Sequence, residues 1–319
     1  MSIEDLTAQA VRIEKKLLDE VRQQRKQLDV VVERLTALEA QQAAMSETVS
    51  KIFKRVVHLE PDVHAVLRAL RLDADALEYP ERLTARRYRL ESQNEEDGIT
   101  LALFEEIGAT SRTFVEIGSG LSGGNSACLA RELGWTGLMV DGSEAHMAQV
   151  ARRFPRVQAV AAWITRENVN QLVRDAGLTG EVDFLSIDLD GNDYWVWEAL
   201  TACSARVVVV EYNSAFGAER AVTIPYDPKF DRHNYRFVYY GASLAALAKL
   251  AAAKGYRLIA AEPHGVNAFF LRNDVAPSIP ACTPERAFHL MKRYDVWMQT
   301  KKEDVYSYAE QAKLPLVDV

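Results

Sequence analysis

The sequence predicts an α/β protein in which a doubly wound, seven-stranded sheet follows a long N-terminal helix of the coiled-coil type. Three observations support this prediction. All sixteen glycines lie at or after Gly98 and the first proline is Pro61, so a long N-terminal stretch lacks helix breakers. Apolar residues in that stretch recur at steps of three and four. Between about Gln93 and Asn273, short apolar runs alternate with helical stretches, as in α/β domains.

The composition excludes several classes of protein. The chain has 319 residues, of which 48% are hydrophobic and 26% are charged, and its formal net charge is −7. These values are ordinary for a globular protein and exclude disorder of the whole chain. The excess of 45 acidic over 38 basic residues argues against a protein that binds duplex nucleic acid, because such a protein needs a basic face. No apolar run approaches the roughly 18 residues that span a bilayer.

The N-terminus and the cysteines predict the cellular location. The first ten residues, MSIEDLTAQA, carry acidic side chains where a signal peptide has a basic segment. Cys128, Cys203 and Cys282 form neither a disulfide framework nor a zinc-binding spacing. We therefore expect the protein in the reducing cytoplasm.

Residues 1–60 are predicted to form a coiled-coil stalk, followed by a helical connector over 61–91. The apolar seam runs from Ile3 to Leu59, with Gln24 and Gln42 in two gaps and a stutter before Val21 that unwinds the supercoil locally. The stalk carries ten basic and ten acidic residues, so its flanks are compatible with copies of itself. A helix of this length cannot bury its stripe alone, so we expect a homo-oligomer. The alternative is an amphipathic helix that folds back on its own domain.

Seven runs are predicted strands, and they lie at 113–117, 137–140, 157–161, 182–187, 206–210, 257–260 and 268–271. Helical stretches such as 125–133 and 244–253 separate the first six. The loop between the last two strands is too short for a helical crossover, so these strands should be antiparallel neighbours. The prediction is therefore six parallel strands and a reversed last strand at one edge. This domain should cover 92–275, with a helical tail over 276–319.

A glycine-rich loop over 118–124 follows the first predicted strand. Glycines between a strand and a helix let the backbone approach a ligand, and the free N–H groups of the helix start can bind it. The second predicted strand ends in Asp141, a little over twenty residues later, where a carboxylate can accept hydrogen bonds from both ribose hydroxyls. The pattern predicts a nucleotide-type ligand at the carboxyl edge of the sheet, either NAD or S-adenosylmethionine.

Glu116 distinguishes between these two ligands. A carboxylate at the entrance of the loop repels a pyrophosphate but suits the ammonium group of a methionine. The glycine spacing also departs from the dinucleotide fingerprint, because Leu121 and Ser122 precede the paired glycines. S-adenosylmethionine is therefore favoured. An NAD-dependent sugar-modifying enzyme is the alternative, although no Tyr-x-x-x-Lys pair stands at a suitable place.

Two segments, Phe114-Val-Glu-Ile-Gly-Ser-Gly120 and Gly137-Leu-Met-Val-Asp-Gly-Ser143, resemble motif I and the ribose acid of class I S-adenosylmethionine-dependent methyltransferases, which have a Rossmann-like fold. Two others, Ser92-Gln-Asn-Glu-Glu-Asp-Gly-Ile99 and Ser186-Ile-Asp-Leu-Asp-Gly-Asn-Asp193, are similar to the FkbM-like branch. That branch contains many O-methyltransferases that act on sugars and other natural products. The resemblance covers about residues 92–272 and leaves the N-terminal coiled coil outside.

The resemblance implies roles for residues at the strand ends. The methionine end of the cofactor would be lined by Glu116, Gly118, Ser119 and Gly120. Asp141 would hold the ribose, and Asp188 would lie beside the sulfonium and the reacting group. Ala162 and Trp163 would contact the adenine; a Trp buried in the core is the alternative.

Acidic residues end two neighbouring predicted strands. Asp188 and Asp190 follow the fourth strand, and Glu211 ends the fifth. Clusters of oxygen ligands favour Mg²⁺ or another hard divalent cation over zinc. A cation that holds a sugar diol and lowers the pKa of a hydroxyl would suit O-methylation. The sequence thus predicts a candidate metal site, with turn-forming Asp and Asn residues as the alternative.

Methylation of an oxygen requires that its proton be removed, and histidine is the usual base near neutral pH. His233 and His264 lie in predicted loops near strand ends and are, together with Asp188, the catalytic candidates. A solvated loop histidine is the alternative for each. We expect a methyltransferase that acts on a hydroxyl of a glycan or a small molecule. A coiled-coil scaffold with a degenerate methyltransferase body is the non-enzymatic alternative.

Overall fold

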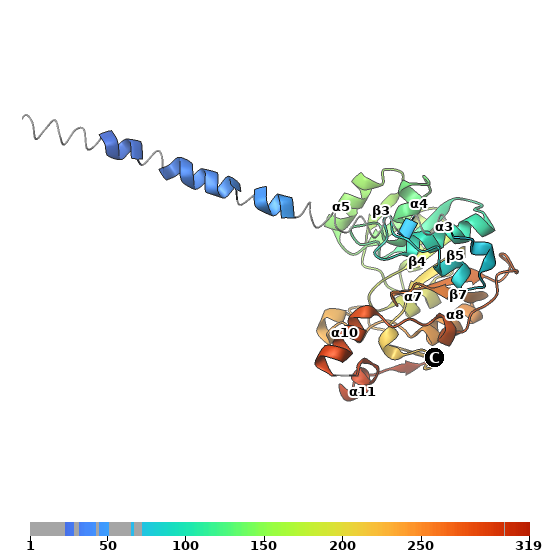
Figure 1. Cartoon of the computed structure of the whole chain (residues 1–319). Helices are drawn as coiled ribbons and strands as arrows, with labels where there is room; N and C mark the ends of the chain where they lie inside the picture. Colours follow the sequence, from blue (N-terminus) through green and yellow to red (C-terminus); the bar gives the residue numbers. More distant parts are fainter. Residues whose placement is uncertain (1–22, 29–31, 43–44, 51–64, 67–71, 303) are drawn as a thin grey trace, which may run out of the picture. The chain divides into compact units, whose positions relative to one another are not determined.

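The computed structural model describes residues 23–28, 32–42, 45–50, 65–66, 72–302 and 304–319. The chain divides into two units, residues 1–61 and 62–319. In the first unit, the described residues are helical and exposed (Figure 1). Apolar residues of the predicted seam, such as Leu28, Leu38 and Val49, are more than half exposed. This confirms the helix for the described residues; most of the seam, including Ile3 to Val21, lies outside them.

The sheet of the second unit has seven strands in the order β3-β2-β1-β4-β5-β8-β7. The strands are β1 Thr113–Ile117, β2 Thr136–Asp141, β3 Gln158–Ala161, β4 Gly180–Ile187, β5 Cys203–Glu211, β7 Tyr256–Ala261 and β8 Asn267–Arg272. The first five strands pair in parallel, whereas β8 is antiparallel to both β5 and β7. The predicted seven-stranded α/β sheet and its reversed last strand are confirmed.

The reversed strand is not at the edge of the sheet, as the sequence had suggested, but between β5 and β7. Its side chains explain this position. Ala268, Phe269, Phe270 and Leu271 are fully buried, so apolar groups must cover both faces of β8. A strand at the edge would leave one row of its backbone groups unpaired, whereas β8 pairs on both sides.

Helices cover both faces of the sheet. One face carries α3 Glu96–Ile107, α4 Ala127–Arg131 and α5 Glu144–Arg153, and the other carries α6 Val169–Asp175, α7 Asp193–Ala199 and α8 Leu244–Ala253. Each face has its own apolar core, and neighbouring residues of β1 alternate between them: Phe114 packs in one and Val115 in the other. The predicted helix over 244–253 matches α8.

The connector is described at residues 65–66 and 72–91. This part contains helical residues 65–66, η1 Ala74–Ala76 and α2 Glu81–Thr84, so it is helical only in places. The basic patch that follows is paired with acidic groups of the main domain, since Arg86 and Arg87 form salt bridges with Glu105 and Glu95. The patch therefore joins the connector to the region around α3.

The C-terminal tail packs against the chain between β5 and α8. It contains α9 Pro284–Ala287, α10 Lys292–Lys301, η5 Val305–Ser307, α11 Tyr308–Gln311 and β9 Val317–Asp318. The expectation of a purely helical tail is corrected by β9, which pairs with β6 Val222–Thr223. Two-residue strands are too short to show a pattern in the sequence. An apolar cluster joins Val238 and Tyr240 to Met291 and Tyr294, so the two segments form one cap.

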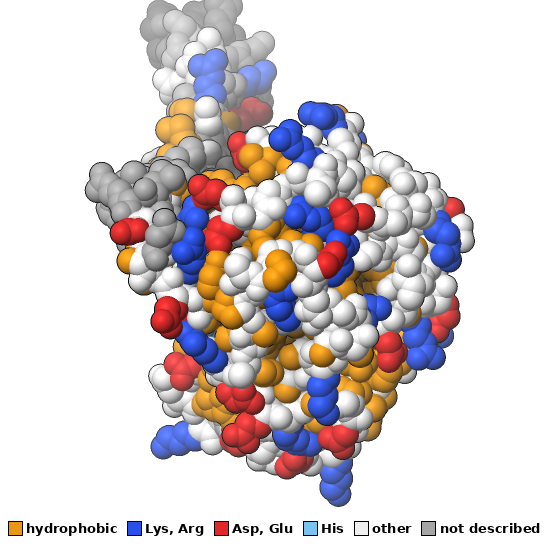
Figure 2. Space-filling model, turned by 90° about the vertical axis from the view of Figure 1, so that its right-hand side faces the viewer, with side chains coloured by type: hydrophobic (Ala, Val, Ile, Leu, Met, Phe, Trp, Pro, Cys, Tyr) orange, Lys and Arg blue, Asp and Glu red, His pale blue; other side chains and the backbone are white. Residues whose placement is uncertain are grey.

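The surface agrees with the mixed charge of the sequence. On the face drawn in Figure 2, basic and acidic side chains are interspersed. Among the described residues, no helix combines the length and the apolar character that crossing a membrane requires.

Candidate active site

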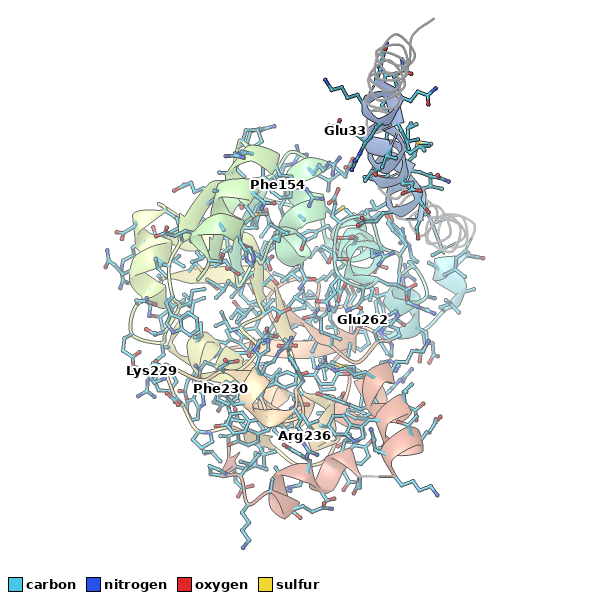
Figure 3. The ribbon with its side chains drawn as sticks, turned by 90° about the vertical axis from the view of Figure 1, so that its left-hand side faces the viewer. Glu33, Phe154, Lys229, Phe230, Arg236 and Glu262 are labelled. Carbon is cyan, nitrogen blue, oxygen red and sulfur yellow. The ribbon has the colours of Figure 1, made fainter. Side chains whose placement is uncertain are left out.

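A cavity of about 1070 Å³ opens at the carboxyl ends of β1, β2, β4 and β5. One wall consists of the glycine loop and the ends of β2 and β4. The opposite wall comes from residues 229–233, the loop after β7 and the start of α10. Figure 3 shows Lys229 and Phe230 on one side of the view and Glu262, which precedes His264 of the β7–β8 loop, on the other. Ligand pockets commonly measure about 300–1000 Å³, so this cavity has room for a nucleotide-sized cofactor and a second ligand.

The glycine loop approaches the end of β4 so closely that one position requires glycine. Gly118 has φ +85°, and a Cβ there would lie 1.8 Å from the carbonyl oxygen of Asp188. Gly118, Ser119 and Gly120 all line the cavity, as the sequence predicted. Their backbone can therefore meet a ligand without side chains in between.

Glu116 has a different place from the one expected. It does not line the cavity but is fully buried beneath the loop, where its carboxylate accepts hydrogen bonds from the backbone N–H groups of Asn125 (3.3 Å) and Ser126 (2.8 Å). Burial raises its pKa to about 7, although the hydrogen bonds from Ser126 act in the opposite direction. A Cβ at Gly124 would lie 2.1 Å from its Oε1. Glu116 thus holds the glycine loop in shape from below and is not among the residues that line the cavity.

Asp141 lies at the end of β2 and lines the cavity. Its Oδ2 accepts a hydrogen bond from the N–H of Gly120 (3.0 Å), and its Oδ1 accepts one from the N–H of Ser143 (2.8 Å). The side chain is 19% exposed, and Nδ1 of His146 also lies 3.3 Å from Oδ1, so the acceptor capacity left for a ligand is mainly on Oδ2. The arrangement fits a ribose, whose two hydroxyls need acceptors fixed in position.

Trp163 forms the wall next to Asp141, whereas Ala162 does not line the cavity. The Trp163 side chain is 61% exposed and its ring lies against Gly142, where a Cβ would be 3.0 Å from the indole. The indole N–H donates to the carbonyl oxygen of Pro228 (2.7 Å), which fixes the ring. Ala162 donates its backbone N–H to the carbonyl oxygen of Asp141. Of the two predicted adenine contacts, the structure thus places only Trp163 at the cavity.

The acidic residues at the ends of β4 and β5 converge as predicted. One oxygen from each of Asp188, Asp190 and Glu211 lies within 4.8 Å of the others. Burial raises the pKa of Asp188 and of Glu211 well above the usual range, and the neighbouring carboxylates raise both further. These oxygens suit a hard divalent cation in chemistry and in number.

Arg232 supplies a positive charge to this cluster. Its Nη1 forms a salt bridge with Asp190 and lies 3.6 Å from Oε1 of Glu211. Burial by itself would lower the pKa of Arg232, but the charges of Glu211 and Asp190 raise it, so the side chain is a cation. The donor set therefore fits a metal ion, but in this structure its charge is met by an arginine of the same chain.

His264 and Glu262 form a dyad at the opposite wall. Nδ1 of His264 bonds to the buried carboxylate of Glu262, whose Oε1 also accepts the backbone N–H of His264 (2.8 Å). The hydrogen bond with Glu262 raises the pKa of His264 above its ordinary value of 6.5, although partial burial acts against it. The ring is 44% exposed and lines the cavity, so Nε2 remains for a substrate.

His233, the second predicted base, also lines the cavity but is held less firmly. Its side chain is 70% exposed, and its Nδ1 pairs with Asp231 (2.6 Å), which is itself half exposed. A base held by a buried carboxylate has a defined orientation. The geometry therefore favours His264 over His233.

Several cavity residues were not singled out from the sequence. Arg232 stands next to His233, and Gln93 and Asn94 belong to one of the segments that carried the family resemblance, so both places held a signal. Lys292 and Arg293 come from the C-terminal tail. No motif marked those two, because only the packing of the cap brings the tail to the sheet.

Comparison of the sequence with protein-family models and with curated proteins finds no match. Solved structures that are similar in part include an O-methyltransferase from Bacillus cereus in complex with SAH, with 19% identity, a TM-score of 0.35, and coverage of 65% of this chain and 89% of that chain. The methyltransferase domain of bacterial CtHen1 has 16% identity, a TM-score of 0.37, and coverage of 56% and 97%. An S-adenosylmethionine-dependent methyltransferase from Aquifex aeolicus has 13% identity, a TM-score of 0.33, and coverage of 62% and 94%.

Proposed function

We propose that this protein is an S-adenosylmethionine-dependent methyltransferase that methylates a hydroxyl oxygen of a glycan or another natural product. One observation carries the proposal: a single cavity at the carboxyl edge of the sheet is lined together by the glycine loop, Asp141 and Trp163. The substrate class rests on the resemblance to the FkbM-like branch.

In this proposal, residues of the chain would contact each part of the cofactor. Trp163 would stack on the adenine, and the Asp141 carboxylate would accept the ribose hydroxyls through Oδ2 and in place of the His146 contact at Oδ1. The methionine end would lie along Gly118 to Gly120, above the loop that Glu116 holds. Asp188 follows β4 at the point where the sulfonium would sit, and a carboxylate there attracts the positive sulfur.

The proposed base is His264. The substrate hydroxyl would give its proton to Nε2 of His264 while its oxygen attacks the methyl carbon, and the bond from that carbon to sulfur breaks. The products are a methyl ether and S-adenosylhomocysteine, and the sulfur keeps the bonding electron pair. Glu262 holds the ring through Nδ1 and favours the imidazolium that forms.

A thermal-shift comparison tests the function. Ligands that bind only the folded chain raise its melting temperature. We expect S-adenosylmethionine and S-adenosylhomocysteine to stabilise the protein, and NAD to leave it unchanged. Stabilisation by NAD alone would favour the sugar-modifying alternative, and no stabilisation by any of the three would favour the scaffold.

We also propose that the N-terminal unit makes the protein a homo-oligomer. In support of this, the described helical residues leave Leu28, Leu35, Leu38 and Val49 exposed, and an apolar row of this kind needs partner helices. Light scattering on the full chain and on a chain that begins at Asp62 should show that only the full chain assembles. Equal mass per particle would contradict this role.

A further inference from the structure

The cluster formed by Asp188, Asp190 and Glu211 has the composition of a divalent-cation site. Its three carboxylates lie within 4.8 Å of one another, and like charges at that distance repel unless a cation separates them. Glu211 is nine-tenths buried or more, with a side chain that is 5% exposed, and its Oε2 has no hydrogen-bond partner among the described residues. The cluster thus has unused capacity for a positive charge.

Arg232 delivers such a charge into the cluster. We propose that Arg232 is the resident cation of the Asp188–Asp190–Glu211 cluster, and that its guanidinium takes the place a divalent metal ion would hold. Nη1 is paired with Asp190 and lies 3.6 Å from Glu211, so a metal ion and the guanidinium compete for the same two carboxylates. This competition does not depend on the proposed reaction.

The environment of Arg232 is that of a fixed internal group. Its side chain is only 20% exposed, and its guanidinium carbon lies 5.5 Å from the ring centre of Phe237 and 5.3 Å from that of Tyr240. Two aromatic faces and two carboxylates therefore hold one planar cation, which suits arginine better than lysine. A surface arginine that only neutralises charge would not be enclosed in this way.

Two other basic side chains face the cluster from neighbouring elements. Arg293 at the start of α10 and His233 beside Arg232 both act on Asp190 through their charge. Arg293, however, donates to the backbone oxygen of Phe237, and no carboxylate of the described residues lies within 4.0 Å of its nitrogens. Arg293 therefore serves as a control: it belongs to the same cavity and carries the same charge, but it does not occupy the cluster.

One consequence rests on the proposed function. If the chain methylates a hydroxyl, the negative charge that develops on the substrate oxygen as its proton leaves would be stabilised by the guanidinium. Wild-type turnover should then continue in excess EDTA. The simpler expectation from the sequence, a Mg²⁺ ion that binds the substrate diol, requires that EDTA stop it.

Binding of Mn²⁺ to the full chain, followed by electron paramagnetic resonance, tests the proposal without any substrate. Removing the guanidinium leaves three carboxylates with oxygen ligands in reach of one another, so Arg232→Ala should bind Mn²⁺ at least about tenfold more tightly than the wild type. Arg232→Gln, which keeps a hydrogen-bond donor without the charge, should behave in the same way. Arg293→Ala removes only a more distant charge, so it should gain much less affinity for Mn²⁺ than Arg232→Ala does.

Two results would overturn the proposal. One is an equal gain in Mn²⁺ affinity in Arg232→Ala and Arg293→Ala. The other is wild-type binding as tight as that of both Arg232 variants, although these variants unfold cooperatively. Binding of S-adenosylhomocysteine, measured on the same samples, separates this outcome from that of the proposed function. A chain that fails to bind S-adenosylhomocysteine but gains Mn²⁺ on loss of Arg232 would refute the reaction and keep the resident cation.

Discussion

Asp183 lies in the first half of β4 and Asp188 directly follows the strand, and the two have opposite surroundings. Near the amino end, Asp183 is fully buried and accepts hydrogen bonds from the backbone N–H groups of residues 110–112 and from Arg206 (2.8 Å). Burial alone would raise its pKa, but the bonds from Arg206 and the backbone lower it to about 2. At the carboxyl end, burial and the charges of Asp190 and Asp193 raise the pKa of Asp188.

The difference shows that the carboxylates without enough hydrogen-bond or ion-pair partners lie at the cavity and not at the other end of β4. The carboxylate of Asp183 is paired with backbone N–H groups and with Arg206, so it helps to hold β4 and β5 to the chain before β1. Asp188 lies among like charges at an open cavity, an arrangement that costs stability and is typical of functional sites. One end of the strand therefore stabilises the fold, and the other prepares a site.

The largest expected effect is on the amino end. Asp183→Asn leaves Arg206 buried, with a 9% exposed side chain and no counter-charge, so it should lower the free energy of unfolding by about 3–5 kcal/mol. Asp188→Asn removes a repelled charge and should leave that free energy unchanged or raise it. Urea unfolding of both variants measures the two effects. Equal destabilisation would mean that the two ends do not differ as described.

At the carboxyl edge, the expected effects are on turnover. His264→Gln should lower the rate by about 10²–10⁴, because a general base contributes about that much, with binding of S-adenosylhomocysteine retained. His233→Gln serves as the matched control and should change the rate little, since that ring is 70% exposed. The reverse ranking would make His233 the base.

Glu262→Gln sharpens the same test through the pH profile. The base must be neutral to accept a proton, so the rate rises with pH through the pKa of His264, which the bond to Glu262 raises. Replacing Glu262 removes the largest cause of that rise and should shift the acid limb of the profile to lower pH. A limb that does not move would show that another group titrates.

A smaller effect is expected at Asp141. Asp141→Ala removes the acceptors for two ribose hydroxyls, so it should weaken binding of S-adenosylhomocysteine by about tenfold or more. The change also removes the bonds to the N–H groups of Gly120 and Ser143, so Asp141→Asn, which keeps one acceptor oxygen, belongs in the same titration. Unchanged calorimetric affinity in both variants would refute the ribose assignment.

The parts that the sequence predicted correctly depend on local pattern. The predicted bounds 113–117 and 244–253 match β1 and α8, because apolar runs and a helix-favouring stretch define them without help from distant residues. The position of β8 inside the sheet depends on pairing with β5. The β6–β9 ladder joins residues far apart in the chain and is too short to have a pattern.

For the site as well, residues placed by local pattern were predicted, and residues placed by contacts between distant elements were not. Gly118, Asp141 and Asp188 directly follow predicted strands, so parallel pairing alone brings them to one edge. The role of Glu116 could not be predicted, because whether a carboxylate faces a ligand or supports a loop depends on which side of the loop it lies. Arg232 was missed since its partners, Asp190 and Glu211, belong to other elements. The pair Glu262 and His264, two residues apart across a turn, did carry a local signal.

The smallest expected effect concerns Asp193, the first residue of α7, whose pKa is shifted in the opposite direction to that of Asp183. Burial raises its pKa to about 6, although the N–H groups of Leu189 and Gly191 bond to it. A carboxyl group whose pKa is raised in the folded state contributes stability at a pH below its ordinary value of 3.8, and this contribution is lost as the pH rises to about 6. For Asp183, whose pKa is lowered, the contribution to stability is present above pH 3.8 and lost as the pH falls to about 2.

Asp193→Asn cannot titrate, and its amide oxygen can still accept one of the loop's hydrogen bonds. The free energy of unfolding of this variant should therefore rise relative to the wild type between about pH 4 and 6. Asp188→Ser, or another uncharged variant at the cavity, should show the same trend. Asp183→Asn should not show it. Parallel curves for the wild type and Asp193→Asn over that interval would show that Asp193 is not held protonated by its surroundings, and the contrast between the two ends of β4 would then rest on Asp188 alone.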